Sequence, residues 1–185
     1  MSRLSILQVD DLSPAARDVH DEIVAGPRGN VEGPLWVWLR SSGLARAASA
    51  FGAFCRFESR VPRKLSELAI LMMGAHWRAG FEWFVHEPAA LSSGWTPEQV
   101  DALKQGLEPG GLAPEERVVF RFCKELLERR QVSDHAYSAL VDTQGESVAV
   151  ELVGILGYYS LVSLTCAVFK VPVPGNNQDP FASNH

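Results

Sequence analysis

The chain has 185 residues, of which 46% are hydrophobic and 21% charged, so it is long enough to bury a sizeable core. Its formal net charge of −5 and the lack of a long basic run argue against nucleic acid as a partner. The three cysteines are widely spaced and form no Cys-x-x-Cys pair, which argues against a disulfide framework and predicts a reducing, cytoplasmic location.

Helix signals dominate the chain, and strand signals are nearly absent. The first expected helix begins with Ser13 as its cap and Pro14 in its first turn, and a Gly- and Pro-rich loop follows at residues 26–34. Thr96 and Gln99 form a capping box further along. The fold class that we predict is all-α. In chain order, we expect helices over residues 13–24, 35–39, 44–58, 63–74, 79–92, 96–106, 114–130, 133–141 and 148–169.

The last of these segments, residues 148–169, is apolar and long enough to cross a bilayer. It contains a single charge, Glu151, but also two tyrosines, two serines, a threonine and two glycines. Helices that are apolar on all sides also occur in protein cores and subunit interfaces. We therefore expect a buried helix and no membrane partner.

The stretch HWRAGFEWFVHEPAA, which begins at His76, concentrates polar and aromatic side chains. Within it, Glu82 and His86 are four residues apart and therefore lie on one helix face. A bend between Gly74 and Gly80 would fold the preceding helix back and bring Glu67 against them. Two carboxylates and an imidazole in a partly apolar place suit proton transfer, because burial moves their pKa values towards neutrality.

Simpler interpretations of the same residues stay open. A Glu–His pair one turn apart is also typical of a surface ion pair, and the aromatic residues of this stretch by default pack in a core or an interface. His76 with Glu82 and His86 lacks a third ligand fixed by spacing, so we expect no metal. No P-loop, Rossmann or nucleophile-elbow pattern is present. The candidate substrate-binding residues are Trp77, Trp83, His76 and Tyr158.

The run LSELAIL followed by WRAGFEWFVHEPAA resembles the carboxymuconolactone decarboxylase / alkylhydroperoxidase D-like family. The likeness extends to Gly33-Pro34 before an apolar helix, and to ELVGILGYY followed by FKVPVP. It covers roughly residues 30–174. The resemblance implies an alkylhydroperoxidase D-like helical bundle, and we expect a single domain over residues 1–185 with an irregular tail at 175–185.

The peroxidase branch of that family carries a Glu, a Cys-x-x-Cys pair and a His four residues after the second Cys. Carried over, the Glu matches Glu67, the His matches His86, and the two cysteine positions fall on Ala79 and Glu82. Without these thiols, dithiol peroxidase chemistry has no nucleophile and no resolving partner. The resemblance to the decarboxylase branch implies acid–base chemistry on a small cyclic, lactone-type carboxylic acid, as a decarboxylase (lyase) or isomerase, with no cofactor. Its catalytic residues are Glu67, Glu82 and His86.

Two other functions are alternatives to this one: a peroxidase-related protein without the redox dithiol, and a non-catalytic small-molecule-binding protein suggested by the aromatic residues. Arg78 is a candidate for holding a substrate carboxylate, although an exposed arginine is the simpler interpretation. Family members are typically homo-oligomers, which implies a trimer or hexamer here.

Overall fold

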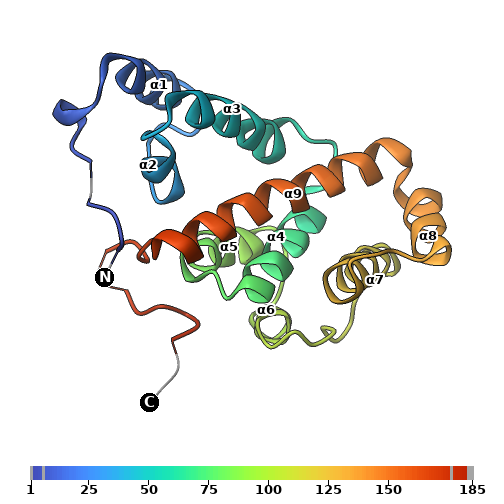
Figure 1. Ribbon diagram of the computed structural model, residues 1–185. Coiled ribbons are helices and arrows are strands. Elements are labelled where there is room, and N and C mark those ends of the chain that lie inside the picture. The colour runs from blue at the N-terminus through green and yellow to red at the C-terminus, as the bar shows by residue number, and fades with distance from the viewer. Residues whose placement is uncertain (1, 6, 176, 183–185) are drawn as a thin grey trace.

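The computed structural model describes residues 2–5, 7–175 and 177–182, and every regular element in this part of the chain is a helix (Figure 1). The all-α prediction is thereby confirmed. Tail residues 176 and 183–185 lie outside the described part, and the tail residues that are described contain no helix. The elements are a 3-10 turn at Val9–Asp11, α1 (Pro14–Ala25), α2 (Pro34–Trp38), α3 (Ser42–Ala53), a π-helical segment at Phe54–Glu58, α4 (Arg63–Trp77), α5 (Gly80–Ser92), α6 (Pro97–Lys104), α7 (Pro114–Arg129), α8 (Asp134–Gln144) and α9 (Glu146–Phe169).

Several helix boundaries differ by a few residues from the sequence prediction, and two of the differences have identifiable reasons. The helix expected over 44–58 changes into a π-helix at Phe54, where the Ser59 N–H donates to the Phe54 carbonyl at 2.9 Å, five residues back. Helix α4 continues past Gly74, where we expected it to end, and ends at Trp77. The expected bend between Gly74 and Gly80 is present, since the left-handed backbone of Arg78 (φ 48°) reverses the chain.

Helix α9 runs through the middle of the molecule, with α1–α3 on one side and α4–α6 on the other (Figure 1). It packs mainly against α4. Its length and apolar composition would suit a membrane span, and half of its most apolar window is buried inside the protein. Leu152 and Ile155 lie in the core, while Val150 and Val153 face outward. One face of α9 therefore belongs to the hydrophobic core.

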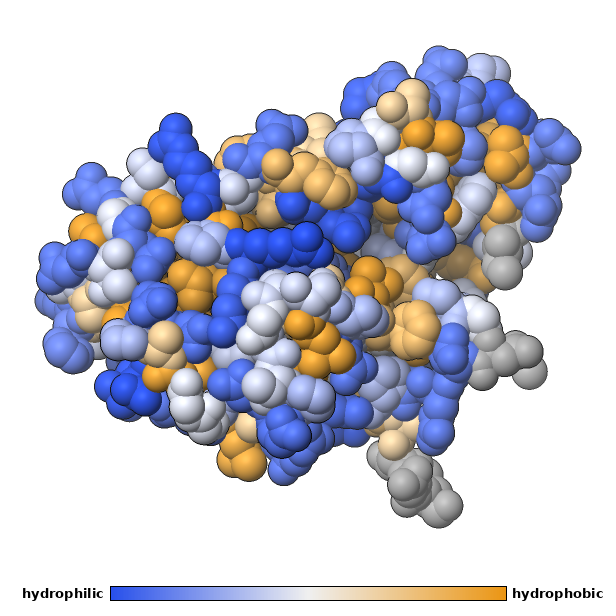
Figure 2. Space-filling model, turned by 180° about the vertical axis from the view of Figure 1, so that it is seen from behind, coloured by the Kyte–Doolittle hydropathy of each residue, from blue (hydrophilic) through white to orange (hydrophobic). Residues whose placement is uncertain are grey.

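Helix α4 is enclosed by α5, α7 and α9, which explains why it lacks a polar face. Every residue from Leu65 to Gly74 is buried, Glu67 included. The surface of the protein differs from α4 in composition, since hydrophobic residues are interspersed among hydrophilic ones when the molecule is seen from behind (Figure 2).

The predicted capping box at the start of α6 is confirmed. The Gln99 N–H donates to the Thr96 hydroxyl, and the Thr96 N–H donates to the Gln99 side chain.

Candidate functional site

The hairpin of α4 and α5 brings Glu67, Glu82 and His86 into direct contact. Glu67 Oε2 lies 2.8 Å from His86 Nδ1, and Glu82 Oε1 lies 2.9 Å from His86 Nε2. The reversal at Arg78 and Ala79 makes this possible, because it returns α5 along α4 so that residues 19 apart in sequence face each other. The imidazole is therefore held between two carboxylates, one from each helix.

This cluster is shielded from water and carries a buried charge. The exposed fraction of the side chain is 4% for His86, 10% for Glu67 and 4% for Glu82. Burial alone would lower the pKa of His86, but the charge of Glu82 and the hydrogen bonds to both carboxylates raise it to about 9. At neutral pH the ring is thus an imidazolium that donates from both nitrogens.

A small cavity of about 70 Å³ opens beside the Glu82 edge of the imidazole. Tyr159 forms part of its wall and stacks edge-on against His86, with ring centroids 5.1 Å apart. Tyr158 lines the same cavity and stacks edge-on against Tyr159 at 5.1 Å. A ligand placed here would touch the proton-bearing groups directly. The apolar part of the wall consists of Pro34, Leu35, Phe81, Val85 and Val162.

A second, larger cavity of about 330 Å³ is lined by Glu67. The π-helical segment and the start of α4 line it with Arg56 and Arg63, and the buried thiol of Cys55 lies in its wall. Glu82 and His86 thus line the smaller cavity, and Glu67 lines the larger one. Arg56 lines both of them.

The candidate substrate-binding residues are distributed over three places. Tyr158 lines the cavity beside His86. Trp83 is fully buried in the core and stacks edge-on against Phe181. Trp77 is exposed, and His76 lines a separate cavity of about 340 Å³ between α4, α6 and α7. Of the four candidate substrate-binding residues, only Tyr158 therefore lines a cavity together with Glu82 and His86.

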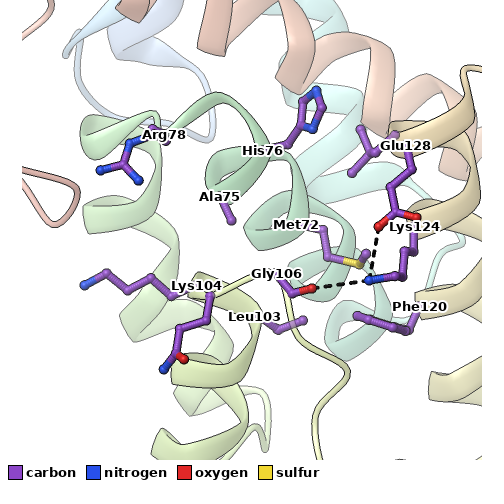
Figure 3. Close-up of a pocket in the computed structure, with 12 residues that line it drawn as sticks. Met72, Ala75, His76, Arg78, Leu103, Lys104, Gly106, Phe120, Lys124 and Glu128 are labelled. Carbon is purple, nitrogen blue, oxygen red and sulfur yellow. Dashed lines mark hydrogen bonds and ion pairs between the residues drawn. The ribbon is translucent and has the colours of Figure 1, made fainter.

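The separate cavity near His76 has its own polar contacts. Figure 3 shows Lys124 between the Gly106 carbonyl at 3.4 Å and Glu128 at 3.1 Å. Arg78, which the sequence suggested for a substrate carboxylate, also lines this cavity and donates to the Phe181 carbonyl at 2.7 Å. Arg78 thus binds the C-terminal tail and does not line the cavity beside His86.

Sequence reasoning missed two arginines that line the cavity beside His86. Arg28 comes from the loop between α1 and α2, and Arg56 comes from the π-helical segment. An arginine within GPRGN is typical of a solvated loop, so no spacing pattern pointed to Arg28. Only the folding of this loop over α9 reveals it: Arg28 donates to the Tyr158 hydroxyl at 3.1 Å, across 130 residues of sequence.

Solved structures with this helical arrangement are similar to the chain over nearly its whole length. A peroxidase-related protein with an alkylhydroperoxidase AhpD core, from Ralstonia eutropha JMP134, matches with a TM-score of 0.75 and 14% identity over 95% of this chain and 93% of that one. A peroxidase-related protein from Silicibacter sp. TM1040 matches with a TM-score of 0.74 and 13% identity, over 92% and 91% of the two chains. The chain has the alkylhydroperoxidase D-like fold.

A third structure with this fold is the debrominase Bmp8, with a TM-score of 0.71 and 14% identity over 91% of this chain and 90% of that one. Comparisons with protein-family models and with curated proteins give no match. At these identities the likeness establishes the alkylhydroperoxidase D-like fold, and chemistry must be argued from the residues of the site.

Within this fold, the thiols of the chain are placed where they cannot react readily. All three cysteines are free and buried. Burial raises the pKa of Cys55 to about 11 and that of Cys123 to about 12, and it raises the pKa of Cys166 further. Thiols with such pKa values hold almost no thiolate at neutral pH. Among the described residues, no group of three His, Cys, Asp or Glu side chains is arranged to hold a metal ion.

Proposed function

We propose that the protein is a cofactor-independent lyase or isomerase that acts on a small cyclic carboxylic acid of the lactone type by acid–base chemistry. The observation that carries this proposal is the buried imidazolium of His86 between Glu67 and Glu82, next to a cavity. Such a charged cluster is costly to bury. A role in proton transfer would account for the presence of this cluster.

In a decarboxylation, the bond between the ring carbon and its carboxylate breaks, and the electron pair stays on the carbon as a dienolate. The carbon then takes up one proton, so a carboxylate and a proton yield the shortened product and carbon dioxide. His86 supplies the proton from its Nε2 edge, where Glu82 accepts it and passes it to the substrate. Glu67 fixes the orientation of the ring through Nδ1, and solvent restores the proton.

The same cluster serves an isomerase, because moving a double bond also requires removal of one proton and delivery of another. Both reactions proceed without the thiolate that a thiol peroxidase requires. The positions that the resemblance assigns to a dithiol hold Ala79 and Glu82, and the thiols of this chain lie elsewhere with raised pKa values. These features favour acid–base chemistry over peroxide reduction.

The test is the release of carbon dioxide from a carboxylated five-membered lactone, measured for the purified protein. Wild type should release it, and His86→Gln should lower the rate by at least about a hundredfold, the usual size of a general-acid contribution. His76→Gln is the matched control, because His76 lies outside the cavity. A ligand that binds but is not converted by wild type would favour the non-catalytic binding protein instead.

We further propose that the protein works as a homo-oligomer, a trimer or a hexamer, in the cytoplasm. The outward face of α9 exposes Val150, Val153, Leu164 and Val168, an apolar strip that a second copy would cover. Free cysteines suit a reducing compartment. Light scattering tests the assembly, and a monomeric mass at micromolar concentration would refute it.

A further inference from the structure

Arg28 is a half-buried cation on the wall of the cavity beside His86. Its guanidinium donates to the neutral phenol of Tyr158 at 3.1 Å, and its buried Nε has no hydrogen-bond partner among the described residues. Removing a guanidinium from water without a carboxylate partner is costly. The cavity therefore contains a cation that lacks a counter-ion.

The two tyrosines add hydrogen-bond donors to the same wall. The buried Tyr159 hydroxyl has no partner in the described part of the chain, and the Tyr158 hydroxyl accepts from Arg28. Burial raises the pKa of Tyr158 to about 12 and that of Tyr159 well above its ordinary value. Both phenols consequently keep their protons and can donate to an acceptor in the cavity.

The backbone of α3 leaves space for this group of donors. A methyl group at Gly52 would lie 2.1 Å from the Tyr158 hydroxyl and 2.3 Å from a terminal nitrogen of Arg28. Any larger residue would displace both side chains. Gly52 therefore lets the phenol and the guanidinium pack side by side against the helix.

We propose that Arg28, Tyr158 and Tyr159 form the recognition site for a carboxylate of the ligand. The apolar walls formed by Leu35 and Phe81 hold its ring. This inference rests on the proposed function for the identity of the ring, while the need for an anion follows from the donors themselves. A cavity of about 70 Å³ corresponds to roughly two waters at about 30 Å³ each, and a carboxylate group with the adjoining edge of the ring would fill it.

Other charged groups near this site are consistent with an anionic ligand. Arg56 lines the cavity and adds a second positive charge. Glu82 is already paired with His86. Glu32 also lines the cavity, but it is exposed and accepts a hydrogen bond from Asn30 at 2.9 Å. An exposed carboxylate is screened by water and competes weakly with a bound anion.

Isothermal titration calorimetry with 2-furoate, and with 2-furamide as its neutral counterpart, tests the site. Wild type should bind furoate at least about tenfold more tightly than furamide, because only furoate has a negative charge that pairs with the guanidinium of Arg28. Arg28→Gln should weaken furoate binding by at least about tenfold and weaken furamide binding less, because the amide loses a hydrogen bond but no ion pair. Glu32→Gln is the control at the same rim and should bind furoate as tightly as wild type or more tightly.

Tyr159→Phe and Gly52→Ala test the site without removing the arginine. The first removes one donor and keeps the ring on His86, and we expect about a threefold to tenfold loss of furoate affinity. The second displaces Arg28 and Tyr158 together and should match the loss seen for Arg28→Gln. If Arg28→Gln does not fold, these two variants decide the matter.

The inference is overturned if wild type fails to bind furoate, binds furamide equally well, or binds furoate as tightly after Arg28→Gln. These outcomes are separate from the fate of the proposed function. Conversion of a lactone acid by an Arg28→Gln variant with unchanged KM would leave the proposed function standing and remove the carboxylate site. If the protein binds furoate only when Arg28 is present but converts no lactone acid, the carboxylate site stands and the proposed function is removed.

Discussion

Glu82→Gln tests the electrostatics of the cluster, because it removes one charge and nearly preserves the side-chain volume. The pKa of His86 rises from its ordinary 6.5 to about 9, and the charge of Glu82 is the largest of the effects that raise it. A rise of this size corresponds to about 3 kcal/mol of preferential stabilisation of the imidazolium. Without Glu82, we expect the pKa of His86 to fall by at least one unit, or about 1.4 kcal/mol.

The sign of the effect on stability follows from the direction of the shift. Because the folded-state pKa of His86 lies above its unfolded value, the stabilisation is fully present below pH 6.5 and is lost as pH rises through about 9. Wild type should therefore lose about 3 kcal/mol of unfolding free energy over this window, and Glu82→Gln should lose at least about 1.4 kcal/mol less.

Two assays measure this prediction. Carbon-detected NMR of labelled histidine gives the pKa of His86, and urea unfolding at pH 6 and pH 9.5 gives the free energies. Glu87→Gln is the matched control, since this neighbouring carboxylate makes no ion pair with His86 among the described residues and should leave the titration unchanged. The reasoning is refuted if His86 in wild type titrates near 6.5, or if Glu82→Gln leaves its pKa near 9.

Three further predictions concern the scaffold and the thiols. Leu152→Ala opens a void in the core along α9 and should lower the unfolding free energy by about 2–5 kcal/mol in urea titrations; a loss below about 1 kcal/mol would mean that the core around this residue is loosely packed. Thr96→Ala removes the cap of α6 and should cost about 1 kcal/mol by thermal unfolding, whereas an unchanged midpoint would show that the cap contributes nothing. Cys55, Cys123 and Cys166 should react with Ellman's reagent at pH 8 only after denaturation, and rapid labelling of the native protein would contradict their burial.

The helices of this fold were predictable because local signals specify them. Pro14 and Thr96 mark helix starts by fixing φ or satisfying free N–H groups, and the structure places both as expected. The contact of Glu67 with His86 also followed from the sequence once a reversal between two helices was assumed. The reversal lies at Arg78, inside the predicted interval from Gly74 to Gly80. Only the end of the helix was misplaced, because Gly74 is tolerated inside a buried helix while Arg78 adopts the left-handed backbone.

The rest of the site depends on packing between segments distant in sequence. Arg28 meets Tyr158 only because the loop after α1 folds over α9, and no periodicity in the sequence encodes that approach. Trp83 and His76, by contrast, lie near Glu82 in sequence but do not join it in the cavity beside His86. Trp83 directly follows Glu82 and His76 precedes it by six residues, yet Trp83 is buried in the core and His76 lines a separate cavity.

The central claim is that His86, held between two carboxylates, supplies through Glu82 the proton that the substrate carbon takes up, without help from sulfur. The most direct measurement is turnover of a carboxylated lactone in D₂O, followed by mass spectrometry of the product. We predict one deuterium at the carbon that lost carbon dioxide, and no product from His86→Gln. Product formed by His86→Gln at the rate of wild type would contradict the account.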